Sequence, residues 1–276
     1  MILLVGDGKR VDVVHAIAQV EPLVREYARD VVVDLDGGHN FKRKLPKLVI
    51  NFGGDGSILH IARRLGEKQV PILGVNFGKF GFLAEFELPD LLVRLKEALA
   101  LKLPMRKSLM LQAAIERAGK RTVRSAVNDV VFQRAPDGRM STVHVAHDGA
   151  ELAAYVGDGL VVATPLGSTA HNLSAGGPIL HPEMDAIVLT PICAHTLSIR
   201  PLALPAGGAL KFWVEPGDAI TLTLDGMDTV ELSGKDVVEV RRAKQPITLV
   251  AHPSRSYFDA LRLKFGWTAR SVVPRR

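Results

Sequence analysis

The residues best suited to chemistry lie in one glycine-rich turn, Gly53-Gly54-Asp55-Gly56. The apolar segment 47–50 predicts a buried strand before the turn. Apolar residues at helical spacing over 58–65 predict a helix after it, with Ser57 as its N-cap. The glycines allow a phosphate close to the backbone, where the helix N-terminus offers unpaired N–H groups. Because a carboxylate repels a phosphate, Asp55 fits better as a base or a metal ligand facing a phosphoryl group. The alternative is a tight turn in which Asp55 only caps the helix.

A second polar cluster follows the apolar segment 160–163, which also predicts a strand. Pro165 and Gly167 indicate a turn, and residues 168–170 predict the start of a helix that ends at glycines 176 and 177. One hydroxyl is enough to cap such a helix, so the other polar side chains indicate contact with a polar ligand. The cluster consists of Ser168, Thr169, His171, Asn172 and Ser174.

Asn128 and Asp129 interrupt an otherwise apolar segment, 126–132. Since side chains alternate in a strand, one of the two faces the core or a cleft, where a polar side chain needs partners. A β-bulge with an internal hydrogen-bond network and a ligand contact both explain the pair. The histidines of the chain do not have metal-ligand spacing, which favours structural or solvent-exposed roles for most of them.

The first part of the chain alternates strand and helix patterns. Repeated strand–helix units predict an α/β domain with a parallel sheet that has helices on both faces. The expected strands are 2–5, 31–33, 47–50 and 70–75, and the expected helices are 11–28, 58–66 and 89–101.

From about residue 108, short β-rich segments separated by Gly, Pro and Asp turns replace this pattern. Their spacing predicts a β-rich, sandwich-like second domain. The helical pattern returns at 256–265. We therefore expect an α/β domain at 1–105, a β-rich domain at 106–253, and a C-terminal helix and tail at 254–276 that return to the first domain.

The composition limits the class of protein. The chain has 276 residues, 47% of them hydrophobic, and a net charge of +6, which predicts a soluble globular protein with a sizeable core. The basic surplus fits a solvated surface, with attraction of polyanionic nucleotides as the alternative. Basic and aromatic residues are not interleaved and no apolar run reaches membrane-spanning length, so neither nucleic acid nor a membrane is an expected partner. The single cysteine, Cys193, favours a reducing compartment and therefore the cytoplasm.

Two familiar nucleotide-binding signatures are missing. Gly6-Asp7-Gly8 begins like the dinucleotide fingerprint, but Val11 stands where the third glycine should be. A Walker-type Gly-Lys-Ser/Thr loop does not occur in the sequence. A nucleotide bound by this chain would therefore use a different phosphate-binding device.

Together these segments resemble the NAD kinase family, over nearly the whole chain and in family order. The Gly-Gly-Asp-Gly motif alone is weak evidence, since lipid kinases and phosphofructokinases have similar turns. The segments Gly167–Ala170 and Ser174–Pro178 are specific to NAD kinases. The other matching segments are Asn76–Leu83, Asn128-Asp129, Asp158-Gly159, Thr164–Leu166, His195–Ser198, Arg200–Leu202, Asp225-Gly226 and Leu261–Lys264.

The resemblance implies an α/β domain, a β-rich domain and a nucleotide site between them. It implies phosphoryl transfer from ATP, or from polyphosphate, to the adenosine 2′-hydroxyl of NAD, giving NADP. Mg²⁺ would be held largely by phosphates and water, without a dedicated protein cage. NAD and ATP are the implied substrates, and a homodimer or homotetramer is the implied assembly.

The resemblance also implies roles for individual residues. Asp55 would be the general base that takes the 2′-hydroxyl proton, and Asn128 and Asp129 would hold ribose hydroxyls. Asp158 would contact a base or the carboxamide. Residues expected near the phosphates or around the NAD pocket are Gly53, Gly54, Gly56, Thr169, Ala170, His171, Asn172, Leu173 and Ser174, with His60 and Arg139 at its periphery.

Four positions depart from the family pattern. His171, Leu166, Val156 and Met227 stand where the family usually has Tyr, Thr or Ser, Arg or Lys, and Gln. These departures affect NAD affinity and donor preference more than the reaction. They motivate one alternative, a non-catalytic NAD or NADP sensor. A related small-molecule kinase acting on a lipid or a sugar is the other, although the hydroxyl-rich segment 164–174 argues against a lipid.

Overall fold

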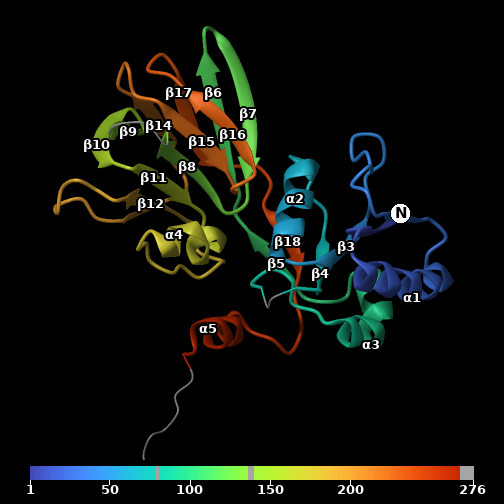
Figure 1. The fold of residues 1–276 in the computed structure, drawn as a ribbon. Helices are drawn as coiled ribbons and strands as arrows, with labels where there is room; N and C mark the ends of the chain where they lie inside the picture. The colour runs from blue at the N-terminus through green and yellow to red at the C-terminus, as the bar shows by residue number, and fades with distance from the viewer. Residues whose placement is uncertain (79–80, 136–139, 268–276) are drawn as a thin grey trace, which may run out of the picture. The chain divides into compact units, whose positions relative to one another are not determined.

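The computed structural model describes residues 1–78, 81–135 and 140–267 (Figure 1). The chain forms two compact units, each with its own core. Unit 1 consists of Met1–Ile61, Val70–Arg106 and the C-terminal part from Thr248, and unit 2 consists of Ala62–Gln69 and Lys107–Ile247. The chain therefore passes between the units several times.

Unit 1 is built on a six-stranded sheet with the order β2-β1-β3-β4-β18-β5. Pairing is parallel from β2 through β1, β3 and β4 to β18, which confirms the predicted parallel sheet. The strand order reverses between β1 and β3, because the chain continues from β1 to β2 on one side and returns to β3 on the other. The strands are β1 (Ile2–Gly6), β2 (Val31–Asp34), β3 (Leu48–Gly53), β4 (Ile72–Asn76), β5 (Met105–Ser108) and β18 (Ile247–Val250).

Helices cover both faces of this sheet, as predicted. α1 (Val11–Tyr27) and α3 (Leu88–Leu99) contribute to the same core as the strand residues Ile2, Leu4 and Ile50 (Figure 1). α1 lies so close to the end of β1 that a Cβ on Gly6 would overlap Val13. α2 (Asp55–Leu65) packs against the opposite face, where Ile58 approaches Gly74 so closely that a side chain at position 74 would overlap it.

α5 (Tyr257–Phe265) also belongs to unit 1. It begins with a reciprocal cap, in which Ser256 Oγ accepts from Asp259 N and the Asp259 carboxylate accepts from Ser256 N. Gly266 ends the helix in the left-handed conformation, with φ of 66°. Leu261 is buried, whereas Phe258 is exposed, so only part of the predicted apolar face is covered in the described structure.

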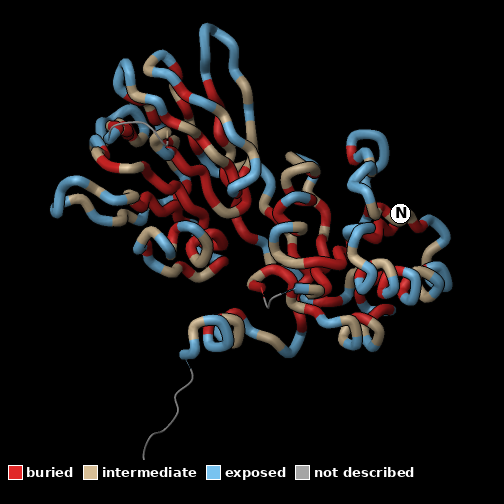
Figure 2. The backbone as a smooth tube through the Cα atoms, in the orientation of Figure 1, coloured by how far each residue is buried: buried red, intermediate tan, exposed pale blue. Residues whose placement is uncertain are grey.

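Unit 2 is an antiparallel β-sandwich, as the turn spacing predicted. One sheet has the order β10-β9-β14-β17-β6-β7 and the other β13-β12-β11-β8-β15-β16. The core between them includes the ring pair Phe132 and Phe212, and buried residues follow the strands (Figure 2). The first sheet consists of β6 (Leu111–Arg117), β7 (Lys120–Ala126), β9 (Ser141–His147), β10 (Ala150–Gly157), β14 (Leu210–Val214) and β17 (Val237–Arg242). The second consists of β8 (Asp129–Arg134), β11 (Gly159–Ala163), β12 (Ala186–Ile192), β13 (Leu202–Pro205), β15 (Ile220–Leu224) and β16 (Asp228–Leu232).

A short helical segment packs on the outer face of the second sheet. The expected helix from residue 168 is instead a 3₁₀ turn, η1 (Leu166–Thr169), followed by the four-residue helix α4 (His171–Ser174). A small core of sheet residues, including Val161 and Val188, receives Leu180 from the following loop. Among the described residues, we find no helix that is both long and apolar enough to cross a membrane.

Candidate active site

The glycine turn lies at the point where the strand order of unit 1 reverses. β3 ends at Gly53 beside the end of β1, with Gly6 in register with Phe52. In open α/β sheets, ligands bind at this switch point beyond the carboxyl ends of the strands. α2 begins at Asp55, three residues before the predicted start at 58. The prediction of Ser57 as the N-cap is therefore wrong, because Ser57 lies inside the first helical turn.

The Asp55 carboxylate is held by a loop that follows β4. Its Oδ2 accepts a hydrogen bond from the backbone N–H of Phe82 at 2.7 Å, and its Oδ1 accepts from Leu83 N at 3.0 Å and Ala84 N at 3.2 Å. A Cβ on Gly81 would overlap this carboxylate, so the loop approaches it as closely as a glycine allows. Asp55 is thus fixed in position by backbone donors almost thirty residues further along the chain.

The glycines of the turn differ in their surroundings. A Cβ on Gly53 would overlap Ser57 Oγ, which accepts from Asn51 Nδ2 at 2.8 Å and donates to Gly54 O at 2.7 Å. A Cβ on Gly54 or Gly56 would meet no atom of the described residues within 4 Å. Gly53 is therefore needed for packing, whereas open space at Gly54 and Gly56 leaves room for a ligand to approach the backbone. The buried Asn51 Oδ1 has no hydrogen-bond partner among the described residues.

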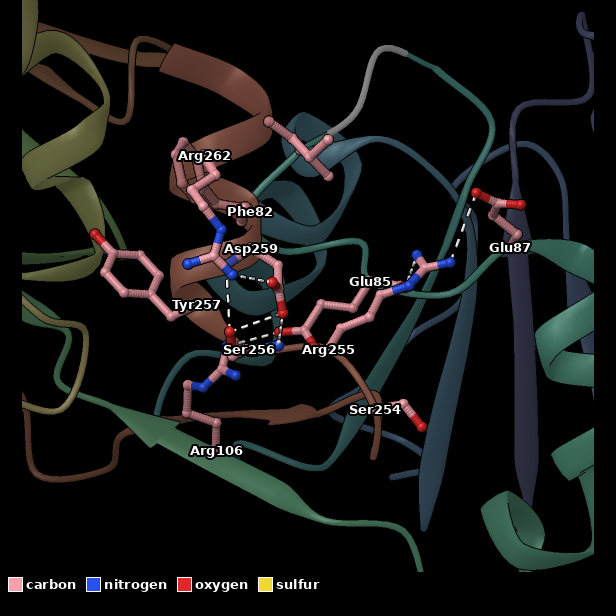
Figure 3. Close-up of a pocket in the computed structure, with 13 residues that line it drawn as sticks. Phe82, Glu85, Glu87, Arg106, Ser254, Arg255, Ser256, Tyr257, Asp259 and Arg262 are labelled. Carbon is pink, nitrogen blue, oxygen red and sulfur yellow. Dashed lines mark hydrogen bonds and ion pairs between the residues drawn. The ribbon is translucent and has the colours of Figure 1, made fainter. Parts of the chain in front are cut away.

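A cavity of about 530 Å³ adjoins the loop that holds Asp55 (Figure 3). Phe82 lines it together with the start of α5, where Arg262 pairs with Asp259. Arg106 pairs with Glu85 at 2.6 Å. Arg255, the third arginine of the cavity, pairs with the carboxylates of Asp90 and Glu87. Each guanidinium is thus paired with an acidic neighbour, so the described lining of this cavity has no surplus positive charge that would select a polyphosphate.

In unit 2, Asn128 and Asp129 lie where the chain turns from β7 to β8. The expected continuous strand over 126–132 is interrupted, because β7 ends at Ala126 and β8 starts at Asp129. Asn128 is half-buried and Asp129 is 4% exposed. Burial, and to a smaller extent the negative charge of nearby Asp225, raise the pKa of Asp129 to about 7.

The hydroxyl-rich segment divides into buried and accessible side chains. Ser168 is buried and bonds to Pro165 O and to the backbone of Leu180, so the expectation that its hydroxyl meets a ligand is not met. Asn172 is also buried: its Nδ2 donates to Ser168 O and Pro178 O, and its Oδ1 accepts from Thr190 Oγ1. The predicted pocket residues with at least partial exposure are Thr169, Ala170, His171, Leu173 and Ser174.

Asp158 lies apart from these groups, just before β11, in a cavity of about 410 Å³ that is also lined by residues of β8 and β15. Arg134 donates from Nε to its Oδ1 at 2.6 Å, and this hydrogen bond lowers the pKa of Asp158. Arg134 thus places a positive charge beside the Asp158 carboxylate, which the uncharged side chain of Val156 cannot do. His60 lies on the exposed side of α2. The predicted site residue Arg139 lies outside the described residues.

The described part of the chain does not offer a preformed metal cage. Within residues 1–78, 81–135 and 140–267, no group of three or more His, Cys, Asp or Glu side chains could hold a metal ion. The chemistry available is therefore that of a fixed carboxylate beside open glycine backbone in unit 1, and of a buried carboxyl with a half-buried amide in unit 2.

These features define a class of two-unit proteins, with an acidic glycine turn on an α/β sheet and a polar turn on a β-sandwich. The same fold occurs in the yeast NADH kinase complexed with NADH, with a TM-score of 0.88, 23% identity and coverage of 99% of this chain and 89% of that one. It also occurs in the Archaeoglobus fulgidus NAD kinase in complex with ATP, with a TM-score of 0.77, 22% identity and coverage of 96% and 98%.

Sequence comparison identifies the family within this class. The ATP-NAD kinase N-terminal and C-terminal domain families match residues 34–103 and 127–252. The Citrifermentans bemidjiense NAD kinase is 41% identical over 226 residues, 81% of this chain and 78% of its own length. The Rhodopirellula baltica NAD kinase is 36% identical over 274 residues, 99% of this chain and 88% of its own length. The chain belongs to the NAD kinase family.

Three structural features escaped the sequence-based predictions of the site. The backbone donors that hold Asp55, the Arg134 partner of Asp158, and Asp225 beside Asp129 all lie far along the chain from the residues they contact. Phe82 and Leu83 lie in the family segment Asn76–Leu83, and Asp225 lies in Asp225-Gly226, but these segments do not indicate what the residues contact. The contacts arise from strand register and loop closure, which residue types do not reveal.

Proposed function

We propose that the chain transfers the terminal phosphoryl group of ATP to the adenosine 2′-hydroxyl of NAD, giving NADP and ADP. The observation that carries this proposal is a fixed carboxylate, Asp55, at the switch point of a parallel sheet, directly after backbone that is open at Gly54. Family membership supports the reaction, and the relatives, among them an NADH kinase bound to NADH and an NAD kinase bound to ATP, support NAD and ATP as the substrates.

Asp55 is the proposed general base. An ionised carboxylate has about four acceptor positions, and the loop at 82–84 uses two on Oδ1 and one on Oδ2. The second position on Oδ2 can accept the ribose hydroxyl without breaking these bonds. As the 2′-oxygen attacks the γ-phosphorus, its proton passes to Asp55, and the bond from phosphorus to the ADP oxygen breaks. The backbone bonds keep the carboxylate in one orientation for this step.

Unit 2 supplies the proposed contacts to NAD. Asn128 and Asp129 would bond to ribose hydroxyls, and a protonated Asp129 could donate as well as accept. The accessible residues of the 169–174 segment would line the pocket. Asn172 would support the segment from within, since its amide is bonded to the backbone on both sides. Asp158, held by Arg134, would meet a base or the carboxamide.

Mg²⁺ fits these residues only as a partner of the bound phosphates. The described residues offer no cage of acidic side chains, and most acceptor positions of Asp55 are already used. Phosphate oxygens and water would therefore supply most ligands of the ion. When bound, it would neutralise charge on the transferred group. Our proposal also includes a cytoplasmic location, on the ground of the single cysteine, and a homodimer or homotetramer.

A coupled assay for NADP formation from NAD, ATP and Mg²⁺ tests the reaction and the base together. Asp55→Asn is expected to lower kcat by a factor of about 10² or more while NAD binding is largely retained. Because this change also weakens the bonds to the 82–84 loop, Gly81→Ala serves as the matched variant. Its methyl group pushes the loop off the carboxylate but leaves the carboxylate in place.

The two variants separate a base from an anchor. If Asp55 is the base, Gly81→Ala keeps considerably more activity than Asp55→Asn; equal losses would assign Asp55 to loop anchoring only. A well-folded wild type that forms no NADP would be tested next with polyphosphate and with NADH. If NAD bound without any turnover, the sensor interpretation would replace the kinase.

A further inference from the structure

Asp225 holds the turn that carries Asn128 and Asp129. Its Oδ1 accepts from the backbone N–H of Asn128 at 2.7 Å and of Asp129 at 3.2 Å, and its Oδ2 accepts from Val127 N at 2.9 Å. In return, Asp225 N donates to Asp129 O at 3.0 Å. One carboxylate thus accepts from three consecutive backbone donors, two of them between β7 and β8 and the third at the first residue of β8.

Thr164 holds the same turn by donating hydrogen bonds to carbonyl groups of the turn. Its Oγ1 donates to Val127 O at 2.7 Å, and its N–H donates to Asn128 O at 2.8 Å. Thr164 is fully buried and its Oγ1 also accepts from Gly167 N, so its position is fixed in turn. A side chain on Gly167 would overlap Asn128 O. The backbone of Asn128 is therefore bonded at both its N–H and its C=O, from two different strand ends.

We propose that Asp225 is a positioning residue which, together with Thr164, fixes the Asn128–Asp129 backbone so that these two side chains are presented to the ribose of NAD. The inference rests on the proposed function, and it assigns Asp225 no contact with the substrate. It explains why a carboxylate occupies the first position of a hairpin turn with φ of 51°, where glycine would be less strained.

The charge of Asp225 also acts on Asp129. The pKa of Asp129 is raised by burial and by the nearby Asp225 carboxylate. Burial also raises the pKa of Asp225, while its backbone donors and the charge of Arg63 oppose that rise. Arg63 is itself paired with Asp228, which in turn pairs with Arg124. Removing the Asp225 charge is therefore expected to lower the pKa of Asp129, an effect that turn stability alone would not produce.

Asp225→Gly is the sharpest test, because glycine suits the positive φ and keeps the hairpin turn while the carboxylate is lost. Asp148→Gly is the matched control: Asp148-Gly149 is also an Asp-Gly turn with φ of 48° and 85°. Among the described residues, the Asp148 carboxylate accepts from Ala209 N and lies 3.7 Å from His147 Nε2, and it does not bond to the Asn128–Asp129 turn. Both variants are compared with wild type for NAD affinity by titration calorimetry, for KM of NAD and ATP, and for amide hydrogen exchange.

Asp225→Gly is expected to weaken NAD binding about tenfold, equivalent to about 1.4 kcal/mol, with KM for ATP little changed. The amides of Val127, Asn128 and Asp129 are expected to exchange about tenfold faster or more. Because the pKa of Asp129 is expected to be lower in Asp225→Gly, any change in NAD affinity caused by ionisation of Asp129 is expected at a lower pH in this variant than in wild type. Asp148→Gly is expected to change none of these quantities.

Asp225→Asn, which keeps the shape but not the charge, is expected to show the same changes to a smaller extent. Wild-type NAD affinity and wild-type amide exchange in both Asp225 variants would overturn the inference. So would an equal loss in Asp148→Gly. Because binding and exchange need no turnover, the result stands even if wild type forms no NADP, and failure of the kinase reaction is thereby kept separate from failure of this inference.

Discussion

Asp129 combines a buried position with a pKa of about 7, well above the 3.8 of an ordinary aspartate. Below pH 3.8 the carboxyl is protonated in both the folded and the unfolded chain. Between pH 3.8 and 7 the unfolded chain releases a proton that the folded chain retains, so rising pH favours unfolding. The free energy of unfolding therefore falls as the pH rises from 3.8 to 7, and Asp129 does not lower it further above pH 7.

Asp129→Asn removes this titration and is predicted to flatten the pH dependence of stability. Between pH 5 and 7 the site can contribute a loss of up to about 3 kcal/mol in wild type, at about 1.4 kcal/mol per pH unit. Urea unfolding in a Trp267→Phe background, followed by Trp213 fluorescence at pH 5, 6, 7 and 8, measures the difference. The free energy of unfolding of Asp129→Asn is expected to increase relative to that of wild type as the pH rises.

Asp158→Asn provides the control for that measurement. The pKa of Asp158 is lowered by Arg134, so its contribution to stability is lost only as the pH falls toward the acid range. Its difference from wild type is expected to be constant between pH 5 and 8. If wild type and Asp129→Asn lost stability in parallel over this range, the buried carboxyl would not retain its proton.

Sequence reasoning predicted local order better than contacts between distant residues. The strand, the glycine turn and the helix around Asp55 were predicted because they follow each other directly in the chain. The loop that binds Asp55 and the Asp225 clamp depend on contacts between distant segments. Buried hydroxyls were also misjudged: Ser168 looks like a ligand donor in sequence, yet its bonds go to the surrounding backbone.

At the scale of elements, boundaries were the least predictable feature. α2 starts at Asp55 because the glycine turn itself enters the helix, and Ser57 Oγ bonds to Gly54 O instead of capping a later start. The polar segment after β11 is too tightly turned for the expected helix and forms η1 and α4. Strands β5, β12 and β13 were not predicted individually, although the sandwich to which β12 and β13 belong was.

α1 contains a proline at an exposed position inside the helix, Pro22. A proline there cannot donate to the carbonyl four residues earlier, and its ring crowds that carbonyl. Pro22→Ala is predicted to raise the free energy of unfolding by about 2 kcal/mol, from a cost of about 3 in the helix less about 1 for the freer unfolded chain. Urea unfolding followed by circular dichroism at 222 nm measures the gain.

Pro89→Ala is the matched control, because Pro89 lies in the first turn of α3, where a missing N–H costs nothing. This change is expected to leave stability unchanged or slightly lower. A neutral or destabilising Pro22→Ala would mean that α1 already accommodates its proline by local bending.

At the scale of the whole molecule, the two units have separate cores and different spectroscopic reporters. α1, α3 and α5 lie in unit 1, so helical dichroism reports mainly on that unit. Trp213 lies on β14 in unit 2 and stacks on His144 with ring centroids 5.2 Å apart. The other tryptophan, Trp267, belongs to unit 1, and a Trp267→Phe background therefore leaves Trp213 as the reporter of unit 2.

We predict that the two units unfold in separable steps, since chains with more than one core commonly depart from two-state unfolding. In the Trp267→Phe background at pH 8, Pro22→Ala should raise the urea midpoint seen by dichroism and leave that of Trp213 fluorescence in place. Asp129→Asn should do the reverse, because its effect arises in the core region of unit 2. The unsubstituted background, measured with both probes, is the reference. If each substitution moved both midpoints equally, the molecule would unfold as one cooperative unit, and the buried charge of Asp129 would then destabilise the glycine turn of unit 1 as much as its own sandwich.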